Sequence, residues 1–267
     1  MTQLNPKREP VETIALIPAR GGSESIPHKN LLKLGNKSLV AWAIEAAFGA
    51  KMVDAVIVST EDAKIAEEAR KYGAIVAPRP AEYATSQSGD AGFFHHCAVW
   101  IEEEYGWMPE LIVNLYPTSP MRFSEDIDAM ITYINESGAD GVKSVIPTVD
   151  HPYKMWKFSN KKPSVGEAGE MQPFLDTEYR RQYGPDQPRQ RVHQMYPVFF
   201  QDGQINITRR KFVLRPESLE YDNIWGDNIH GFVLDPRTAT DIDCEEDLWH
   251  AEKVYKRIAE ERGLELE

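Results

Sequence analysis

The sequence has few cysteines and no long apolar run. Its two cysteines, Cys97 and Cys244, lie far apart, so neither forms a local zinc-binding or redox pair. No stretch reaches the roughly 18 apolar residues of a membrane-spanning helix. The first ten residues, MTQLNPKREP, lack the apolar core of a signal peptide and are expected to form a flexible arm. These absences indicate a cytoplasmic protein with no membrane partner.

Basic residues are also scarce relative to acidic ones. The formal net charge is −12, which argues against nucleic acid as a partner. A local basic pocket for a small anion remains compatible with this balance. With 267 residues, of which 42% are hydrophobic, the chain is long and apolar enough to bury a substantial core.

Strand-like and helix-like segments alternate through the first half of the chain. Short apolar runs predict strands at 13–19, 54–60, 74–77, 110–116 and 140–148. Helical spacing of apolar residues follows most of them, at 39–47, 62–72, 88–105 and 125–135. This pattern predicts an α/β fold whose mainly parallel sheet is flanked by helices.

The alternation stops near residue 150, where prolines are scattered and no helical period is visible. A final helix is expected at about 245–262. We therefore predict a single domain over 11–267, with a small inserted element at about 150–205.

The loop after the first strand carries the clearest chemical signal. Its sequence, RGGSESIPHKN, combines two glycines with Arg20 and Lys29 and follows a strand end, where ligands of α/β sheets bind. The glycines allow close approach of backbone N–H groups to an anion. The loop matches neither the P-loop nor the dinucleotide-binding pattern, and Glu24 puts a negative charge inside it. A glycine-rich connector with solvated charges is the alternative.

Five stretches resemble the acylneuraminate cytidylyltransferases, or CMP-sialic acid synthetases. In order they are ALIPARGGSESIPHKN, VIVSTEDAKIAEEARKYGA, RPAEYAT, LYPTSPMR and TDIDCEEDLWHAE, and they run from about Ile14 to Glu252. The resemblance implies a Rossmann-like fold of the nucleotide-diphosphosugar-transferase type, with the inserted element serving dimerisation in a homodimer. It also implies a reaction that joins CTP to an acidic nine-carbon sugar and releases pyrophosphate, with Mg²⁺ as cofactor.

The resemblance also assigns site residues. Those matched to CTP binding are Arg20, Gly21, Gly22, Ser23, Lys29, Asn30 and Arg79. Those matched to the sugar pocket are Tyr116, Thr118, Ser119 and Arg122, together with the less securely aligned Arg189 and Arg191. Arg20, Lys29 and Asp241 are the expected catalytic residues. Each basic or polar assignment has a plain alternative, such as a surface arginine, a turn or a solvated basic face.

Asp241 and Asp243 are similar to the metal-binding pair of that family. Spaced two apart on an extended strand, both carboxylates face the same way, which suits Mg²⁺. Asp243 followed by Glu246 also resembles a capping box at the start of the final helix, so a purely structural role stays open for Asp243.

Three departures from the family pattern keep other functions open. Glu24 stands where the family has lysine, Tyr116 where it has a glutamine of the sugar pocket, and QINI replaces AIYI. The resemblance implies a sugar of neuraminic, legionaminic or pseudaminic type, whereas Tyr116 and QINI favour the alternative of a related sugar nucleotidyltransferase with another base or sugar. A third possibility is a catalytically weak nucleotide-binding homologue.

Overall fold

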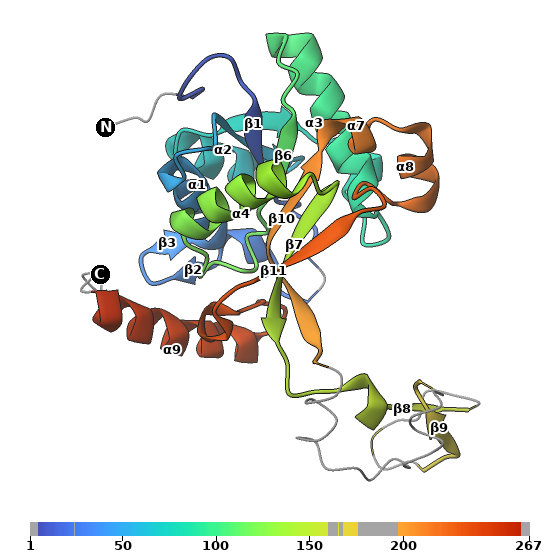
Figure 1. Cartoon of the computed structure of the whole chain (residues 1–267). Coiled ribbons are helices and arrows are strands. Elements are labelled where there is room, and N and C mark those ends of the chain that lie inside the picture. The colour runs from blue at the N-terminus through green and yellow to red at the C-terminus, as the bar shows by residue number, and fades with distance from the viewer. Residues whose placement is uncertain (1–4, 24, 160–164, 166–167, 176–196, 263–267) are drawn as a thin grey trace. The chain divides into compact units, whose positions relative to one another are not determined.

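A seven-stranded sheet organises most of the chain. The computed structural model describes residues 5–23, 25–159, 165, 168–175 and 197–262 (Figure 1). The chain divides into two compact units, Met1–Val145 with Gln201–Glu267, and Ile146–Phe200. The larger unit holds the sheet and the helices packed on it.

The sheet is mostly parallel. Its order is β11-β7-β10-β6-β1-β4-β5. The bounds are β1 (Thr13–Pro18), β4 (Ala55–Thr60), β5 (Ile75–Pro78), β6 (Leu111–Asn114), β7 (Gly141–Pro147), β10 (Phe199–Arg209) and β11 (Ile229–Val233). Strand β10 runs antiparallel to β6, whereas β1, β4, β5 and β6 pair in parallel. The predicted α/β class is confirmed.

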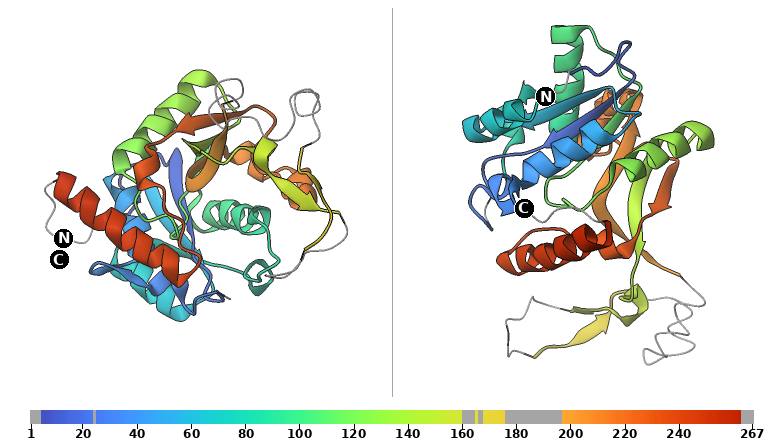
Figure 2. Two further views of the ribbon diagram at one scale, coloured as in Figure 1. Left: turned by 90° about the horizontal axis from the view of Figure 1, so that it is seen from below. Right: turned by 90° about the vertical axis from the view of Figure 1, so that its left-hand side faces the viewer.

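Helices cover both faces of this sheet, as the views of Figures 1 and 2 show. On one face lie α1 (Leu39–Gly49), α2 (Ala63–Lys71) and α4 (Ser124–Ser137), and on the other lies α3 (Asp90–Tyr105). Alternate side chains of β1 serve the two cores, since Ile17 packs toward α1 and Leu16 toward α3. Both side chains are fully buried.

The last helix, α9 (Glu245–Arg262), packs against the β2 (Lys33–Leu34) and β3 (Lys37–Ser38) hairpin. The Tyr255 ring meets Trp42 edge to face, with 5.4 Å between centroids. The turn between β2 and β3 contains Gly35, whose φ is 63°. A Cβ there would come within 3.0 Å of the Tyr255 ring, so glycine meets both the conformational and the spatial demand.

The remaining short elements join these layers. They are η1 (Lys29–Leu31), η2 (Ala81–Tyr83), α7 (Arg210–Val213), α8 (Pro216–Tyr221) and η4 (Pro236–Thr238). Asp140, just before β7, accepts the backbone N–H groups of Asp227 (3.1 Å) and Asn228 (3.0 Å) ahead of β11. These two bonds hold the pKa of Asp140 below its ordinary value.

Part of the segment expected as a flexible arm is fixed to the sheet. The Asn5 amide donates to the carbonyls of Val56 (2.8 Å) and Gly73 (3.2 Å). Arg8 pairs with Asp54, a fully buried carboxylate. Residues 1–4 lie outside the described part of the chain.

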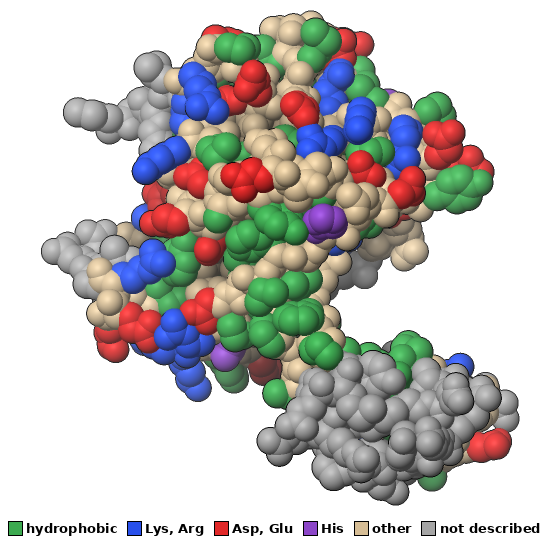
Figure 3. All heavy atoms as spheres, in the orientation of Figure 1, with side chains coloured by type: hydrophobic (Ala, Val, Ile, Leu, Met, Phe, Trp, Pro, Cys, Tyr) green, Lys and Arg blue, Asp and Glu red, His purple; other side chains and the backbone are tan. Residues whose placement is uncertain are grey.

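The smaller unit contains a two-stranded antiparallel hairpin of β8 (Trp156–Phe158) and β9 (Met171–Pro173), preceded by η3 (Pro152–Lys154). Several of its apolar side chains are exposed, among them Phe158, Met171 and Phe174. On the face drawn in Figure 3, acidic and basic side chains of the larger unit are interspersed. Among the described helices, none has both the length and the apolarity to cross a bilayer.

Candidate active site

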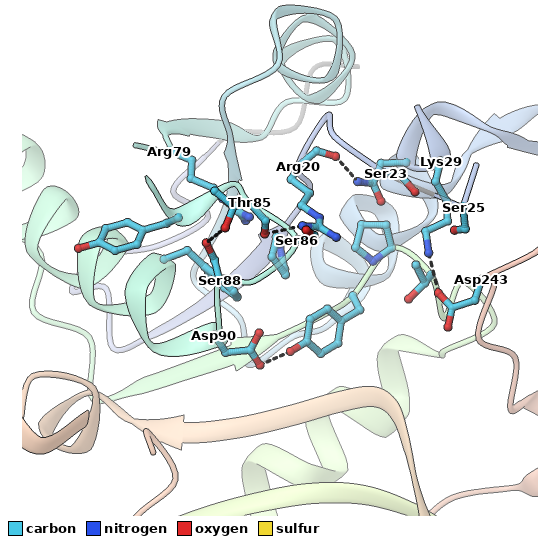
Figure 4. Close-up of a pocket in the computed structure, with 17 residues that line it drawn as sticks. Arg20, Ser23, Ser25, Lys29, Arg79, Thr85, Ser86, Ser88, Asp90 and Asp243 are labelled. Atoms are coloured by element: carbon cyan, nitrogen blue, oxygen red, sulfur yellow. Dashed lines mark hydrogen bonds and ion pairs between the residues drawn. The ribbon is translucent and has the colours of Figure 1, made fainter. Parts of the chain in front are cut away.

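A polar cavity opens at the edge of the sheet where the parallel strands end. Its volume is about 450 Å³, within the usual range for small-ligand sites. It is lined by Pro18, Arg20, Ser23, Ser25, Lys29, Asn30, Arg79, Tyr83, Thr85, Ser86, Ser88, Asp90, Phe93, Tyr116, Pro117, Thr118 and Asp243 (Figure 4). Most of these residues follow β1, β5 or β6, so the carboxyl ends of parallel strands on the same edge of the sheet build the site.

The loop after β1 brings two cations to this cavity. The Arg20 guanidinium donates to the carbonyl of Thr85. Lys29 lies two residues after Pro27, at the far end of the loop. Asn30 is buried and its amide donates to the Arg20 carbonyl at 2.9 Å, which ties the two ends of the loop together. The loop is therefore held by its own side chains before any ligand is considered. Glu24 lies outside the described residues.

The two glycines of this loop differ in their surroundings. The Gly21 N–H donates to a carboxylate oxygen of Glu61 at 2.7 Å, and Gly21 does not line the cavity. A Cβ on Gly21 would lie 2.6 Å from Oδ2 of Asp62, whereas a Cβ on Gly22 would meet nothing within 4 Å. Gly21 is thus required for close packing against Asp62, the residue that caps α2.

Lys29 pairs with a carboxylate from the far end of the chain. Its ammonium lies 2.7 Å from Oδ1 of Asp243, as the dashed line in Figure 4 marks. The Lys29 side chain is mostly buried, and that of Asp243 is exposed. Asp247, not Glu246, reaches back to the start of α9, accepting the N–H groups of Asp243 and Cys244. The capping pattern anticipated for Asp243 and Glu246 is therefore replaced, and the Asp243 carboxylate turns to Lys29.

Asp241 stands beside this ion pair but does not line the cavity. The residue between the two aspartates, Ile242, is buried and donates its N–H to the Thr118 carbonyl at 2.9 Å. The Asp241 side chain is exposed, yet neighbouring protein atoms remove enough water to raise its pKa. The charge of Asp243 raises this pKa further, and a hydrogen bond with Thr118 opposes the shift.

A divalent cation would relieve the repulsion that Asp243 exerts on the Asp241 carboxylate. No cluster of three or more Asp, Glu, His or Cys side chains with metal-binding geometry occurs in the described ranges. A cation at Asp241 and Asp243 would therefore take its other ligands from substrate oxygens and water. This donor set fits Mg²⁺, which commonly keeps several such ligands.

Arg79 lies in the cavity wall after β5. Its Nε donates to the Ser59 hydroxyl (3.1 Å) and its Nη2 to the Ser59 carbonyl (3.0 Å). The guanidinium stands 4.5 Å from the centroid of the Phe93 ring. Burial lowers the pKa of Arg79 to about 10, so the group keeps its charge at neutral pH.

Tyr116, which follows β6, and Asp90, which begins α3, are in contact in the cavity wall. The Tyr116 hydroxyl donates to Oδ2 of Asp90, and burial raises the pKa of both groups. Thr118 also lines the cavity.

Ser119 and Arg122, predicted to bind sugar, are buried and are not among the lining residues. The Ser119 N–H and Nη2 of Arg122 both reach the Tyr116 carbonyl, so these residues shape the turn that presents Tyr116. Burial lowers the pKa of Arg122 to about 9. Arg189 and Arg191 lie outside the described part of the chain.

The sequence analysis did not single out several lining residues. Most belong to the segment from the end of β5 to the start of α3, where only Arg79 had been chosen: Tyr83, Thr85, Ser86, Ser88, Asp90 and Phe93. The signal that was available is compositional. RPAEYATSQSGD is a run of small and polar residues directly after a strand end, which is where α/β ligands bind.

Comparison with known proteins identifies the family. A family model described as cytidylyltransferase matches residues 14–182. The chain belongs to the cytidylyltransferase family. It is thus a nucleotidyltransferase, as predicted, and the recognised resemblance to the acylneuraminate branch is confirmed by curated relatives.

Among these relatives is post-translational flagellin modification protein B of Campylobacter coli, 25% identical over 95% of this chain and 97% of its own. CMP-N,N'-diacetyllegionaminic acid synthase of Campylobacter jejuni is 26% identical over 88% of this chain and 92% of its own. N-acylneuraminate cytidylyltransferase of Escherichia coli is 41% identical over 43% of this chain and 26% of its own. The chain spans about half (52%) of the corresponding Streptococcus agalactiae enzyme.

Solved structures share the fold. The CTP complex of CMP:2-keto-3-deoxy-manno-octonic acid synthetase aligns with a TM-score of 0.64 at 18% identity, covering 92% of this chain and 99% of that one. A 4-diphosphocytidyl-2C-methyl-D-erythritol synthase aligns with a TM-score of 0.58 at 15% identity, covering 91% and 98%.

Proposed function

We propose that this protein transfers CMP from CTP to a nonulosonic acid of neuraminic, legionaminic or pseudaminic type and releases pyrophosphate. The observation that carries the proposal is the cavity itself. It gathers Arg20, Lys29 and Arg79 at the carboxyl edge of a cytidylyltransferase sheet, with Asp243 beside Lys29. Relatives named for sialic and legionaminic acid synthesis support the sugar class.

The cations of the first loop suit the triphosphate of CTP. In the proposed reaction the anomeric hydroxyl of the sugar attacks the α-phosphate in line with departing pyrophosphate, so negative charge moves onto the leaving group. Arg20 and Lys29 would neutralise that charge, and a site that already holds its donors in place needs little reorganisation at the moment of reaction. The Asn30 bond to the Arg20 carbonyl supports such pre-organisation.

Arg79 is proposed to contact the nucleotide base. Its two bonds to Ser59 and its position above Phe93 fix the guanidinium, so the Arg79 side chain would lose little freedom on binding. Asp241 and Asp243 are the proposed holders of Mg²⁺, which when bound would supply charge neutralisation at the phosphates. Asp243 would then share its charge between the ion and Lys29.

Dimerisation is proposed for the smaller unit. Exposed Phe158, Met171 and Phe174 give it apolar surface that a second chain would cover. By resemblance, Arg189 and Arg191 of this region would contact the sugar carboxylate.

The test is pyrophosphate release from CTP with Mg²⁺ across a panel of nonulosonic acids, sugar phosphates and the four nucleotides. We expect release with CTP and at least one nonulosonic acid. Lys29→Ala is expected to lower kcat/KM about a hundredfold, or ~2.7 kcal/mol of barrier, whereas Lys33→Ala, an exposed lysine of the nearby hairpin, leaves it unchanged. Release with GTP and a sugar phosphate but not with CTP would contradict the proposal. CTP binding without any turnover would identify a nucleotide-binding homologue instead.

A further inference from the structure

Helix α3 is capped by a residue from outside the helix. Its N-cap is Gly89, which has no side chain to accept the free N–H groups of the first turn, and Asp90 is the first helical residue. Here the Ala91 N–H instead donates to Oδ1 of Asp222 at 2.7 Å. The Asp90 carboxylate is turned away from the helix and toward the cavity (Figure 4).

Asp222 takes this position through an uncommon backbone conformation. It ends α8 in the left-handed region, with φ at 49°, where few non-glycine residues are found. The close approach also depends on Gly89, because a Cβ there would lie 2.1 Å from Oδ2 of Asp222. Asp222 thus supplies the cap that Gly89 lacks, and the Asp90 side chain lines the cavity.

The Asp90 carboxylate is held in a defined orientation. Within the described part of the chain, the Tyr116 hydroxyl is the side-chain group that hydrogen-bonds to Asp90, at Oδ2. Neighbouring Asp222 adds a second negative charge, while Lys143 and Arg79 oppose it at longer range. Oδ1 of Asp90 is thereby left as an acceptor on a cavity wall, with a phenolic oxygen next to it.

The charged side chains that line the cavity favour different parts of a substrate on its two sides. In Figure 4, Asp90 lies away from Lys29 and Asp243, on the side of Ser88. Phosphate groups are attracted to Arg20 and Lys29 and repelled by a carboxylate. The wall at Asp90 thus suits an uncharged part of a substrate that donates hydrogen bonds.

We propose that Asp90 and Tyr116 form a recognition pair for the sugar acceptor, binding an uncharged donor group, either a hydroxyl or an amide N–H, and disfavouring an anionic group at the same place. The inference rests on the proposed function and deepens it, since it says which part of the acceptor the site selects. It also assigns a partner to Tyr116. Because the Tyr116 hydroxyl donates to Asp90, the pair offers hydrogen-bond acceptors to the substrate. The glutamine amide that the family has in place of Tyr116 would offer both a donor and an acceptor.

The test compares acceptors that differ by one substituent: hydroxyl, amide N–H, hydrogen or carboxylate. Steady-state kcat/KM is measured for each with wild type, Asp90→Asn and Tyr116→Phe, and the KM for CTP is measured in parallel. Tyr133→Phe is the matched control, because its hydroxyl bonds to His230 outside the cavity. Melting curves verify folding, and if Asp90→Asn does not fold, the conservative Tyr116→Phe carries the comparison.

We expect both variants to lose about tenfold in kcat/KM (~1.4 kcal/mol of barrier) with the preferred donor-bearing acceptor and less than twofold with its hydrogen analogue. The KM for CTP should stay within about twofold. Equal losses with all acceptors, or a rise confined to the KM for CTP, would overturn the inference and assign Asp90 to general packing or to the nucleotide.

The two proposals fail differently. If wild type releases no pyrophosphate with any nonulosonic acid, the proposed function is wrong. The recognition pair is then judged with whichever acceptor of the panel is turned over, by the same ratio of kcat/KM values.

Discussion

Gly21 and Gly22 provide a matched pair of substitutions in one loop. An alanine Cβ at position 21 would lie 2.6 Å from Oδ2 and 2.8 Å from Cβ of Asp62, closer than real contacts allow. At position 22 the same atom meets nothing within 4 Å, and neither glycine has a positive φ. Gly21→Ala must therefore displace Asp62 or the loop, whereas Gly22→Ala disturbs neither.

The size of the effect follows from what Asp62 does. Its Oδ1 accepts the N–H groups of Lys64 (2.8 Å) and Ile65 (3.0 Å), the first turn of α2. Loss of such a cap costs about 1 kcal/mol. Replacing glycine by alanine also restricts the unfolded chain, which stabilises by about 0.4–1 kcal/mol where the native conformation allows it. Gly22→Ala should keep that gain, so the two variants should differ in stability by about 1 kcal/mol or more.

The assay is urea denaturation followed by circular dichroism, with thermal melting alongside. For a chain of this length a 1 kcal/mol difference corresponds to about 2–4 °C in Tm. Repeating both substitutions in an Asp62→Gly background removes all three atoms nearest to the Gly21 Cβ. The difference between positions 21 and 22 should then disappear. Equal destabilisation by Gly21→Ala and Gly22→Ala, or a difference that persists without the Asp62 side chain, would refute the reasoning.

Two further predictions concern carboxylates. Asp241→Ala is expected to raise the Mg²⁺ concentration for half-maximal turnover about tenfold, since one of two proposed ligands is lost. The control is Asp227→Ala, which changes an exposed aspartate away from the cavity. An unchanged Mg²⁺ titration in Asp241→Ala would remove Asp241 from the metal site. Asp140→Asn addresses acid stability. Because hydrogen bonds from Asn228 and Asp227 lower the folded-state pKa of Asp140, its charge stabilises the fold above the ordinary aspartate pKa of about 3.9, and that contribution is lost as pH falls through the lowered value. Wild type should thus exceed the variant in urea midpoint near pH 6, and this gap should narrow as pH falls below about 3.9. A gap that is constant with pH would contradict the assignment.

The sequence predicted those strands of the sheet that are marked by a local run of apolar residues. Apolar runs placed β1, β4, β5, β6 and β7 within a residue or two, because a strand buried on both faces leaves a continuous apolar stretch. The position of β10 carries no such signal. It lies between β6 and β7 and pairs Asn206 with Asn114 through the backbone, a contact between residues 92 positions apart in the sequence.

The site residues also differ in how far the sequence alone could predict their positions. Arg20 and Arg79 directly follow strands, and Lys29 lies at the far end of the loop after β1, so their approach to one edge could be expected from an α/β pattern. Asp90 could not be found in this way, because it lies within a helix and its place in the cavity wall depends on its contact with Tyr116. Ser119 and Arg122 sit in the expected turn, but burial directs them inward, and burial of a turn residue is set by the elements packed around it.

The ion pair between Lys29 and Asp243 has a consequence for how the protein is made. Synthesis proceeds from the N-terminus, so the first loop exists long before residue 243 leaves the ribosome. The segment matched by the family model, 14–182, ends before both this aspartate and the interior strand β10. A nascent chain of that length carries the first four of the five family-like motifs but neither a complete sheet nor the carboxylate that faces Lys29. Competence for ligand is thus one of the last properties the growing polypeptide acquires.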